Sequence, residues 1–334
     1  MLSGLMGAIR AQKPLVHCIT NYVTANDCAN LLLACGASPI MADDPDECRE
    51  VTRMCRALVL NLGTPSPRRI EAMLRSGREA VQMGLPVVFD PVGVGCSHMR
   101  MDAAARILSE TKPSIIRGNA SEISALCELA HTGHGSDYDD ANASLAALAH
   151  AGHDSSHDDA PASLAALAHA NHDSSHDDAN ASLAALTHAG HGVDADQSDA
   201  VHGANRALAL ARRTGAVVLM TGASDIVTDG RTLLRVNNGD SMMRLVTGAG
   251  CQLSALAGAF AAVSPNEPLI AALAAACAMG LCGEMARRAL RPDEGSASFR
   301  MRMIDAMSML TPDMLKKGAN YDTDKADHAP VCGD

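Results

Sequence analysis

The chain has 334 residues, of which 47% are hydrophobic and 19% are charged, so it can build a packed core and is not wholly disordered. Its formal net charge is −11 and it holds no long basic run, which excludes nucleic acid or an anionic membrane as a main partner. The 11 cysteines are scattered without a Cys-x-x-Cys pair, which indicates reduced thiols and not a disulfide framework.

The first residues show no basic start, apolar run and cleavage site, so no signal peptide is expected. The longest apolar stretch, residues 269–283, is too short to span a bilayer and predicts a buried helix. We therefore expect a soluble, cytoplasmic protein.

Short apolar runs alternate with longer amphipathic segments along most of the chain. In chain order, they predict strands at 58–62, 86–89, 114–116 and 216–220, and helices at 67–83, 101–110 and 121–130. An Asp-Gly turn at 229–230 predicts a hairpin of strands 225–228 and 232–236 at the sheet edge. The last third predicts helices at 251–263, 267–289 and 299–310. This rhythm is typical of an α/β fold with a mostly parallel sheet and helices on both faces.

Three copies of a 19-residue unit interrupt this pattern at 139–157, 158–176 and 177–195. Eleven of the 14 histidines lie between His131 and His202, so the repeats could bind metal. A solvent-exposed insertion without a task is the interpretation we favour, because no single copy supplies a closed ligand set.

Without the repeats, the length fits one domain with a single core. We expect that domain to comprise residues 1–130 and 191–315, with 131–190 as an insertion and 316–334 as a flexible tail.

Each of the four predicted parallel strands is followed by glycine together with a charged or hydroxyl residue. These are Gly63-Thr64, Asp90 before Gly93, Arg117-Gly118 and Thr221-Gly222. Ligands of open α/β sheets bind beyond the carboxyl ends of the strands, so these residues predict a binding edge.

The sharpest local feature is Thr247-Gly248-Ala249-Gly250-Cys251, which leads into an apolar helix. Unpaired backbone N–H groups and the helix dipole suit such a turn to a phosphoryl group. The same field predicts a lowered pKa for Cys251. The turn is not a Walker A loop, because no Lys-Ser or Lys-Thr follows the glycines.

A second feature is Arg117-Gly118-Asn119 with Glu122. An arginine just past a strand can grip phosphate oxygens, and Asn119 and Glu122 could face one hydrated Mg²⁺, with Asp90 as a second carboxylate. Glu122 could equally be a capping carboxylate of the helix that starts there. With the anion-binding turn, these residues predict an ATP·Mg²⁺ phosphotransferase without a P-loop.

Five ordered motifs carry a resemblance to a known family. They are His-Cys-Ile-Thr-Asn-Tyr-Val at 17–23, Phe-Asp-Pro-Val-Gly at 89–93, Ile-Arg-Gly-Asn at 116–119 with Glu122, Val-Thr-Asp-Gly at 227–230, and the turn at 247–251. In these motifs the chain closely resembles hydroxyethylthiazole kinase, of the ribokinase-like group. The resemblance covers residues 15–130 and 192–310, and Ala249 stands where the family usually has Thr.

The resemblance implies a ribokinase-like fold and a homotrimer with active sites between subunits. It implies that ATP, with Mg²⁺, phosphorylates the hydroxyl of 4-methyl-5-(2-hydroxyethyl)thiazole in thiamine salvage. Carried over by position, the thiazole would contact Met41, Asn21 and Gly248. Arg117 and Thr221 would bind ATP, and Cys251 would take the place of an aspartate base.

Two other functions stay open on the sequence alone. One is a kinase of a related vitamin precursor, such as a hydroxymethylpyrimidine. The other is a non-catalytic metal-binding protein that uses the His-rich repeats. The presence of Asp90, Arg117, Glu122 and Cys251 argues against this second function.

Overall fold

The computed structural model describes residues 2–131 and 197–325. Apart from the first residues of one helix, these belong to a compact unit formed by residues 1–135 and 203–334. The three repeats, and with them the prediction that their histidines bind metal, lie outside the described residues.

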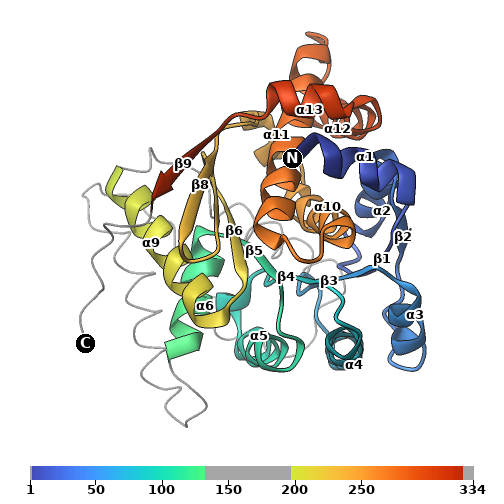
Figure 1. Ribbon diagram of the computed structural model, residues 1–334, viewed down its shortest axis with the longest axis vertical. Helices are drawn as coiled ribbons and strands as arrows, with labels where there is room; N and C mark the ends of the chain where they lie inside the picture. Colours follow the sequence, from blue (N-terminus) through green and yellow to red (C-terminus); the bar gives the residue numbers. More distant parts are fainter. Residues whose placement is uncertain (1, 132–196, 326–334) are drawn as a thin grey trace, which may run out of the picture. The chain divides into compact units, whose positions relative to one another are not determined.

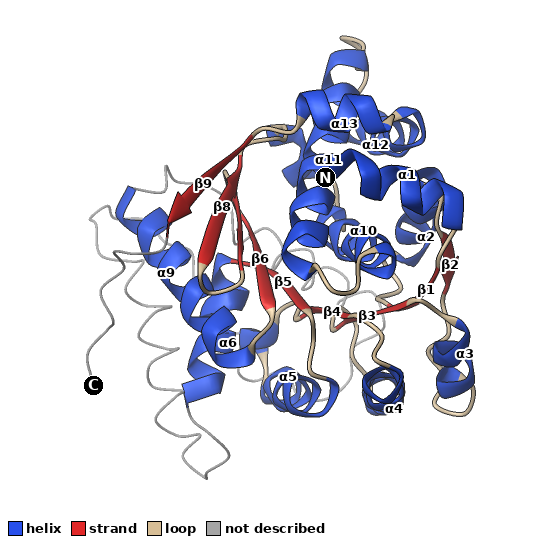
Figure 2. Ribbon diagram, viewed as in Figure 1, coloured by secondary structure: helices blue, strands red, loops and turns tan. Residues whose placement is uncertain are grey.

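A nine-stranded sheet runs through the described part of the chain (Figure 2). Its strand order is β2-β1-β3-β4-β5-β6-β7-β8-β9, parallel from β2 to β6 and antiparallel from β6 to β9. The strands are β1 (Leu15–Ile19), β2 (Ser38–Ile40), β3 (Ala57–Asn61), β4 (Val87–Asp90), β5 (Ile115–Asn119), β6 (Val217–Thr221), β7 (Asp225–Thr228), β8 (Thr232–Val236) and β9 (Tyr321–Lys325).

Helices cover both faces of this sheet (Figure 1). One face carries α1 (Leu2–Gln12), α2 (Ala25–Cys35), α10 (Ala249–Val263), α11 (Pro268–Ala289), α12 (Ser296–Met309) and α13 (Pro312–Gly318). The other carries α3 (Cys48–Met54), α4 (Pro67–Met83), α5 (His98–Thr111), α6 (Ala120–His131) and α9 (Gln197–Thr214). Two short 3₁₀ turns are η1 (Val94–Cys96) and η2 (Ser241–Leu245). The predicted α/β class with a mostly parallel sheet is confirmed.

The largest part of the core lies between the sheet and helices α10 and α11. Strand side chains such as Val59, Val88 and Leu219 are buried there against the alanine-rich helices. At Gly258 of α10 a Cβ atom would lie 2.5 Å from Cγ2 of Val59, so only glycine lets the helix come this close to the sheet. The close approach holds the start of α10 next to the ends of the central strands.

Among the described helices, α11 is long and apolar enough to cross a membrane, with a mean hydropathy of 1.8 over its most apolar window. The helix has 22 residues and is longer than the 15-residue apolar stretch at 269–283, which alone is too short to span a bilayer. Because 78% of that window is buried within the fold, α11 has the character of a core helix.

Several predicted elements are confirmed with the same bounds, namely α4 and the hairpin strands β7 and β8. Strand β5 differs, because it continues to Asn119 where the sequence predicted an end at residue 116. Arg117 pairs with Leu219 and Asn119 with Thr221, so both residues lie within the strand instead of after it.

The carboxyl-terminal segment also differs from the prediction. The hairpin does not form the sheet edge, since β9 pairs along β8 from Tyr321↔Val236 to Lys325↔Thr232. The expected flexible tail from residue 316 is therefore wrong up to residue 325. Its Tyr-Asp-Thr-Asp-Lys sequence lacks an apolar alternation, and it is ordered by the backbone groups of β8.

Candidate active site

Polar residues end four neighbouring parallel strands at one edge of the sheet. Asn61 of β3 lies opposite Asp90 of β4, and Asn119 of β5 lies opposite Thr221 of β6. The start of α10 lies at the same edge, because Asn61 Nδ2 lies 3.3 Å from Cys251 Sγ and, in the next turn, Ser254 Oγ donates to Asp90 Oδ2 over 2.7 Å. The structure thus gathers the residues that the sequence placed at a binding edge.

The glycines of the turn before α10 are required by close contacts. Gly248 has a left-handed φ of 82°, and a Cβ atom there would lie 2.1 Å from Cγ2 of Thr24. At Gly250 a Cβ atom would lie 2.2 Å from Nη1 of Arg117. The first intrahelical bond runs from the N–H of Gln252 to the carbonyl of Gly248 over 2.9 Å. The N–H groups of Gly250 and Cys251 precede that bond and have no acceptor within the helix.

The sulfur of Cys251 accepts hydrogen bonds from two side-chain amides. Asn21 Nδ2 lies 3.2 Å from Sγ and Asn61 Nδ2 lies 3.3 Å from it. Asn21 Oδ1 accepts in turn from the backbone N–H of Thr24 over 3.1 Å, which fixes the orientation of that amide. The environment therefore favours a sulfur that accepts hydrogen bonds.

Burial nevertheless raises the pKa of the Cys251 thiol to about 11, with a further contribution from the Asp90 carboxylate. Arg117 and the hydrogen bonds from Thr24 and Asn61 lower this pKa without offsetting burial. The predicted lowering of the Cys251 pKa is wrong, because loss of hydration outweighs the field of the helix terminus. Cys28, Cys35 and Cys277 are buried and pack as small core residues.

Asp90 is fully buried beside Cys251. Its Oδ2 accepts from Asn61 Nδ2 over 2.8 Å and from Ser254 Oγ, and it lies 3.7 Å from Nη1 of Arg117. Burial raises the pKa of Asp90 to about 6, and the Glu122 carboxylate adds to the rise. Its Oδ1 is buried with no hydrogen-bond partner.

Arg117 faces the centre of the site from β5. Its Nη2 donates to Thr221 Oγ1 over 2.8 Å, so the two predicted ATP-binding residues contact each other. Its Nε is buried without a partner. The guanidinium therefore lies between Asp90, Thr221 and the first turn of α10.

Glu122 forms a reciprocal cap at the start of α6. Its Oε2 accepts from the N–H of Asn119 over 2.8 Å, and Asn119 Oδ1 accepts from the N–H of Glu122 over 2.9 Å. Its Oε1 accepts from the N–H of Gly93 over 2.9 Å, which ties the loop after β4 to α6. The capping interpretation of Glu122 is confirmed.

Asp90 and Glu122 also fit a hydrated Mg²⁺. Both offer only oxygen atoms, and the unpartnered Oδ1 of Asp90 has a free acceptor position. Within residues 2–131 and 197–325, no group of three or more metal-ligating side chains gathers, so this carboxylate pair would share the ion with water and phosphate oxygens.

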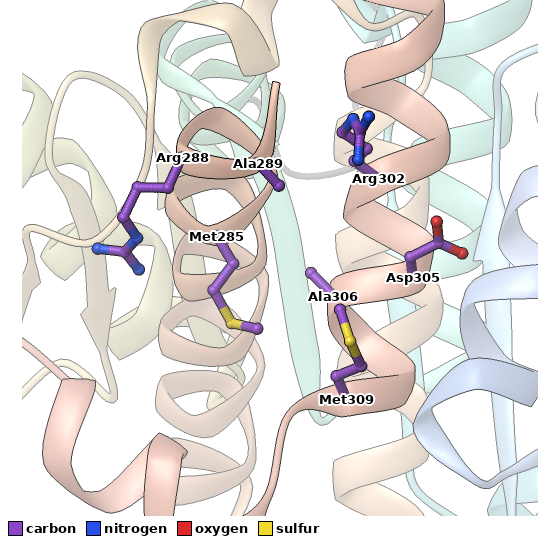
Figure 3. A pocket seen from close by; sticks show the side chains of 7 residues that line it. All are labelled: Met285, Arg288, Ala289, Arg302, Asp305, Ala306 and Met309. Atoms are coloured by element: carbon purple, nitrogen blue, oxygen red, sulfur yellow. The ribbon is translucent and has the colours of Figure 1, made fainter. Parts of the chain in front are cut away.

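Met41 directly follows β2, next to β1, and is 36% exposed. A groove of about 390 Å³ lies elsewhere, between α11 and α12 (Figure 3). It is lined by Met285, Arg288, Ala289, Arg302, Asp305, Ala306 and Met309. It contains none of the predicted site residues and is not the candidate active site.

Asn61, Ser254 and Arg100 are among the residues of the site that were not predicted from the sequence. Asn61 ends an otherwise apolar strand, and that single polar residue was the available signal. Arg100 of α5 donates to the carbonyls of Leu62, Gly63 and Val92, which fixes the loops after β3 and β4. Nothing in its local sequence distinguishes it from a surface arginine.

The fold is a mostly parallel α/β sheet, and at the carboxyl ends of its strands the start of α10 lies beside an arginine and two carboxylates. This is the arrangement of a ribokinase-like kinase. The sequence matches the hydroxyethylthiazole kinase family over residues 6–154 and 178–313. The chain belongs to that family.

Curated relatives named hydroxyethylthiazole kinase cover nearly all of the chain. The protein from Clostridium acetobutylicum is 38% identical over 97% of this chain and 100% of its own length. The protein from Clostridium beijerinckii is 37% identical over 95% of each chain.

A solved structure shows the same fold. Hydroxyethylthiazole kinase protein from Pyrococcus horikoshii OT3 superimposes with a TM-score of 0.72 at 28% identity, over 97% of this chain and 99% of that one.

Proposed function

We propose that this protein transfers the terminal phosphoryl group of ATP to the hydroxyl of 4-methyl-5-(2-hydroxyethyl)thiazole, in thiamine salvage in the cytoplasm. The observation that carries the proposal is the position of Cys251. Its sulfur accepts two amide hydrogen bonds directly beside the N–H groups of Gly250 and Cys251, which have no acceptor within the helix. A proton acceptor and a phosphoryl-binding turn therefore lie within one residue of each other.

The chemistry follows from this arrangement. The hydroxyl oxygen attacks the terminal phosphorus, its proton passes to the sulfur of Cys251 in its thiolate form, and ADP leaves. The N–H groups of Gly250 and Cys251 and the dipole of α10 stabilise the charge on the transferred group. The transition state of phosphoryl transfer is loose, so positioning and charge stabilisation contribute more than a strong base.

Arg117 and Thr221 are assigned to the ATP phosphates. The guanidinium has more donors than its contacts with Thr221 and Asp90 use, and its Nε has no partner. A planar, permanently charged group of this kind suits phosphate oxygens.

Asn21, Met41 and Gly248 are assigned to the thiazole. A small neutral heterocycle needs an apolar surface with few polar groups; Met41 is a partly exposed methionine, and Asn21 carries an oriented amide. The left-handed Gly248 lets the backbone come close to the hydroxyethyl end.

Mg²⁺ is proposed as the cofactor, held by Asp90 and Glu122 together with the nucleotide. When bound, it neutralises phosphate charge. Asp90 ends β4, and Glu122 of α6 accepts from the N–H of Gly93 in the loop that follows β4.

A homotrimer is proposed as the working form. Tyr22 and Val23, directly after Asn21, are 76% and 51% exposed. Two exposed apolar side chains beside a substrate-binding residue are consistent with a second subunit that completes the site. Light scattering of the purified protein measures the assembly, and a monomer would contradict this part of the proposal.

We further propose that residues 131–190 are an insertion in the kinase domain. The family match is interrupted between residues 154 and 178, where the second of the three repeats lies.

The test is ATP-dependent ADP release with the thiazole alcohol and, in parallel, with a hydroxymethylpyrimidine. A higher kcat/KM for the thiazole alcohol supports the proposal, and preference for the pyrimidine assigns the chain to the related kinase. Release with neither alcohol, together with tight zinc or nickel binding, would support the metal-binding alternative.

A further inference from the structure

Asn61, the last residue of β3, uses its whole side chain in hydrogen bonds and is only 1% exposed. Its Nδ2 donates to Asp90 Oδ2 over 2.8 Å and to Cys251 Sγ over 3.3 Å. Its Oδ1 accepts from the N–H of Gly63 over 2.8 Å and from Asn21 Nδ2 over 3.1 Å. Four polar groups from four different segments thus meet at one amide.

The orientation of this amide follows from its partners. The backbone N–H of Gly63 can only donate, so the side-chain atom beside it must be the carbonyl oxygen. The Nδ2 group is then directed at Asp90 and Cys251. Because the Asp90 carboxylate only accepts when ionised, it holds the same orientation from the other side.

We propose that Asn61 is a positioning residue that fixes the sulfur of Cys251 for proton transfer. The role rests on the proposed function, since it concerns the step in which the hydroxyl proton leaves the substrate. Asp90 and Gly63 anchor the amide, and its second N–H is left to hold the sulfur.

Loss of this amide would leave the sulfur with Asn21 as its remaining side-chain amide donor. It would also leave the N–H of Gly63 without the acceptor that it has in the buried turn after β3. Asn21 would lose the acceptor Asn61 Oδ1 but stay held by the N–H of Thr24 and by the Cys251 sulfur, and the contacts proposed for Met41 and Thr221 would stay in place. The expected defect therefore lies in kcat more than in either KM.

A double-mutant cycle with Asn61→Ala and Cys251→Ala tests the role. Asn61→Ala should lower kcat at least about tenfold, with both KM values within about threefold, since positioning acts on the chemical step. In the Cys251→Ala background the same substitution should lower kcat by less than about threefold, because the group that it positions is already gone.

Leu60→Ala is the matched control. Leu60 is the preceding residue of β3, its side chain points to the opposite face, and it is fully buried, so the variant loses stability without contact to Cys251. Melting curves of all variants, with kcat per folded molecule, separate stability from positioning, and Leu60→Ala should keep the wild-type kcat.

Equal losses of kcat from Asn61→Ala in both backgrounds, with an active wild type, would overturn the role of Asn61 alone. An unchanged kcat in Asn61→Ala would do the same. A wild type that phosphorylates no thiazole alcohol would overturn both this role and the proposed function.

Discussion

Cys251 combines a high proton affinity with an environment that presents hydrogen-bond donors to its sulfur. A pKa of about 11 means that the thiol is protonated at neutral pH, and only about one molecule in 10⁴ carries a thiolate at pH 7. The two amides of Asn21 and Asn61 stabilise the charged form once it arises. The thiolate of Cys251 is therefore a strong proton acceptor that is rarely populated at neutral pH.

This pKa predicts a pH dependence. Since the pKa of Cys251 lies above the pH of the assay, each unit of pH multiplies the thiolate fraction by about ten. The kcat of the wild type should therefore rise between pH 7 and 9 with a slope near one on a logarithmic scale. Cys251→Asp should remain active with a flat profile, because a carboxylate ionises at a much lower pH than a thiol in the same surroundings and can accept the same two amide bonds.

Cys251→Ala should lower kcat by about 10²–10⁴-fold without abolishing it, since general base catalysis supplies that range and the turn proposed to bind the phosphoryl group is kept. Steady-state kinetics across this pH range decide the matter. An alanine variant as active as the wild type, beside an inactive aspartate variant, would show that Cys251 is a packing residue only.

Gly250 and Arg117 provide a second prediction at the residue scale. Gly250→Ala places a Cβ atom against the Arg117 guanidinium, so the arginine must move. Both Gly250→Ala and Arg117→Ala should raise the KM for ATP at least about tenfold and change the KM for the thiazole alcohol less than about threefold.

Gly4→Ala, where a Cβ atom meets nothing within 4 Å, is the control and should match the wild type. If the two site variants affected only the alcohol KM, Arg117 would belong to the other substrate.

At the scale of elements, local sequence predicted helix α4 well because its signals are local. Ser66 accepts from the N–H of Arg69, Pro67 starts the helix, and Gly84 ends it in a left-handed conformation. Strand β9 carries no such signal. It is a strand only because β8 offers unpaired backbone groups, which lie far away in the sequence.

Strand β9 should contribute to stability and not to catalysis. Truncation after Asn320 removes β9 but keeps the bond from the N–H of Asn237 to the carbonyl of Asn320. We expect the free energy of unfolding to fall by about 1–3 kcal/mol, from the lost edge pairing, with kcat/KM within about threefold. Urea unfolding and kinetics of the truncated protein check this. A tenfold loss of kcat/KM in a folded truncation would give β9 a role in the site.

At the scale of the whole molecule, the site joins segments that are distant in the sequence. Asn21 and Cys251 are 230 residues apart, and Asn61 and Cys251 are 190 apart. Sequence motifs predicted most of these residues individually. The hydrogen bonds between them, and the burial that raises the pKa of Cys251, depend on the packing of α10 on the sheet and cannot be read from local pattern.

The repeats should be dispensable for chemistry. A deletion of residues 139–190, closed by a short Gly/Ser bridge, should leave kcat/KM within about tenfold. The reason is that the free-energy cost of closing a loop changes by only about 0.6 kcal/mol for each doubling of loop length. Kinetics of the deleted and full-length proteins check this, and a deletion variant that folds but has lost its activity would make the repeats part of the catalytic unit.

Direct detection of the phosphorylated alcohol tests the central claim most sharply. ³¹P NMR of full-length protein, ATP, Mg²⁺ and the thiazole alcohol should show a phosphate monoester appearing in equal amount with ADP. The signal should be strongly reduced with Cys251→Ala. ADP formed without the ester, or an ester that forms equally fast with Cys251→Ala, would contradict the proposed phosphoryl transfer at this site.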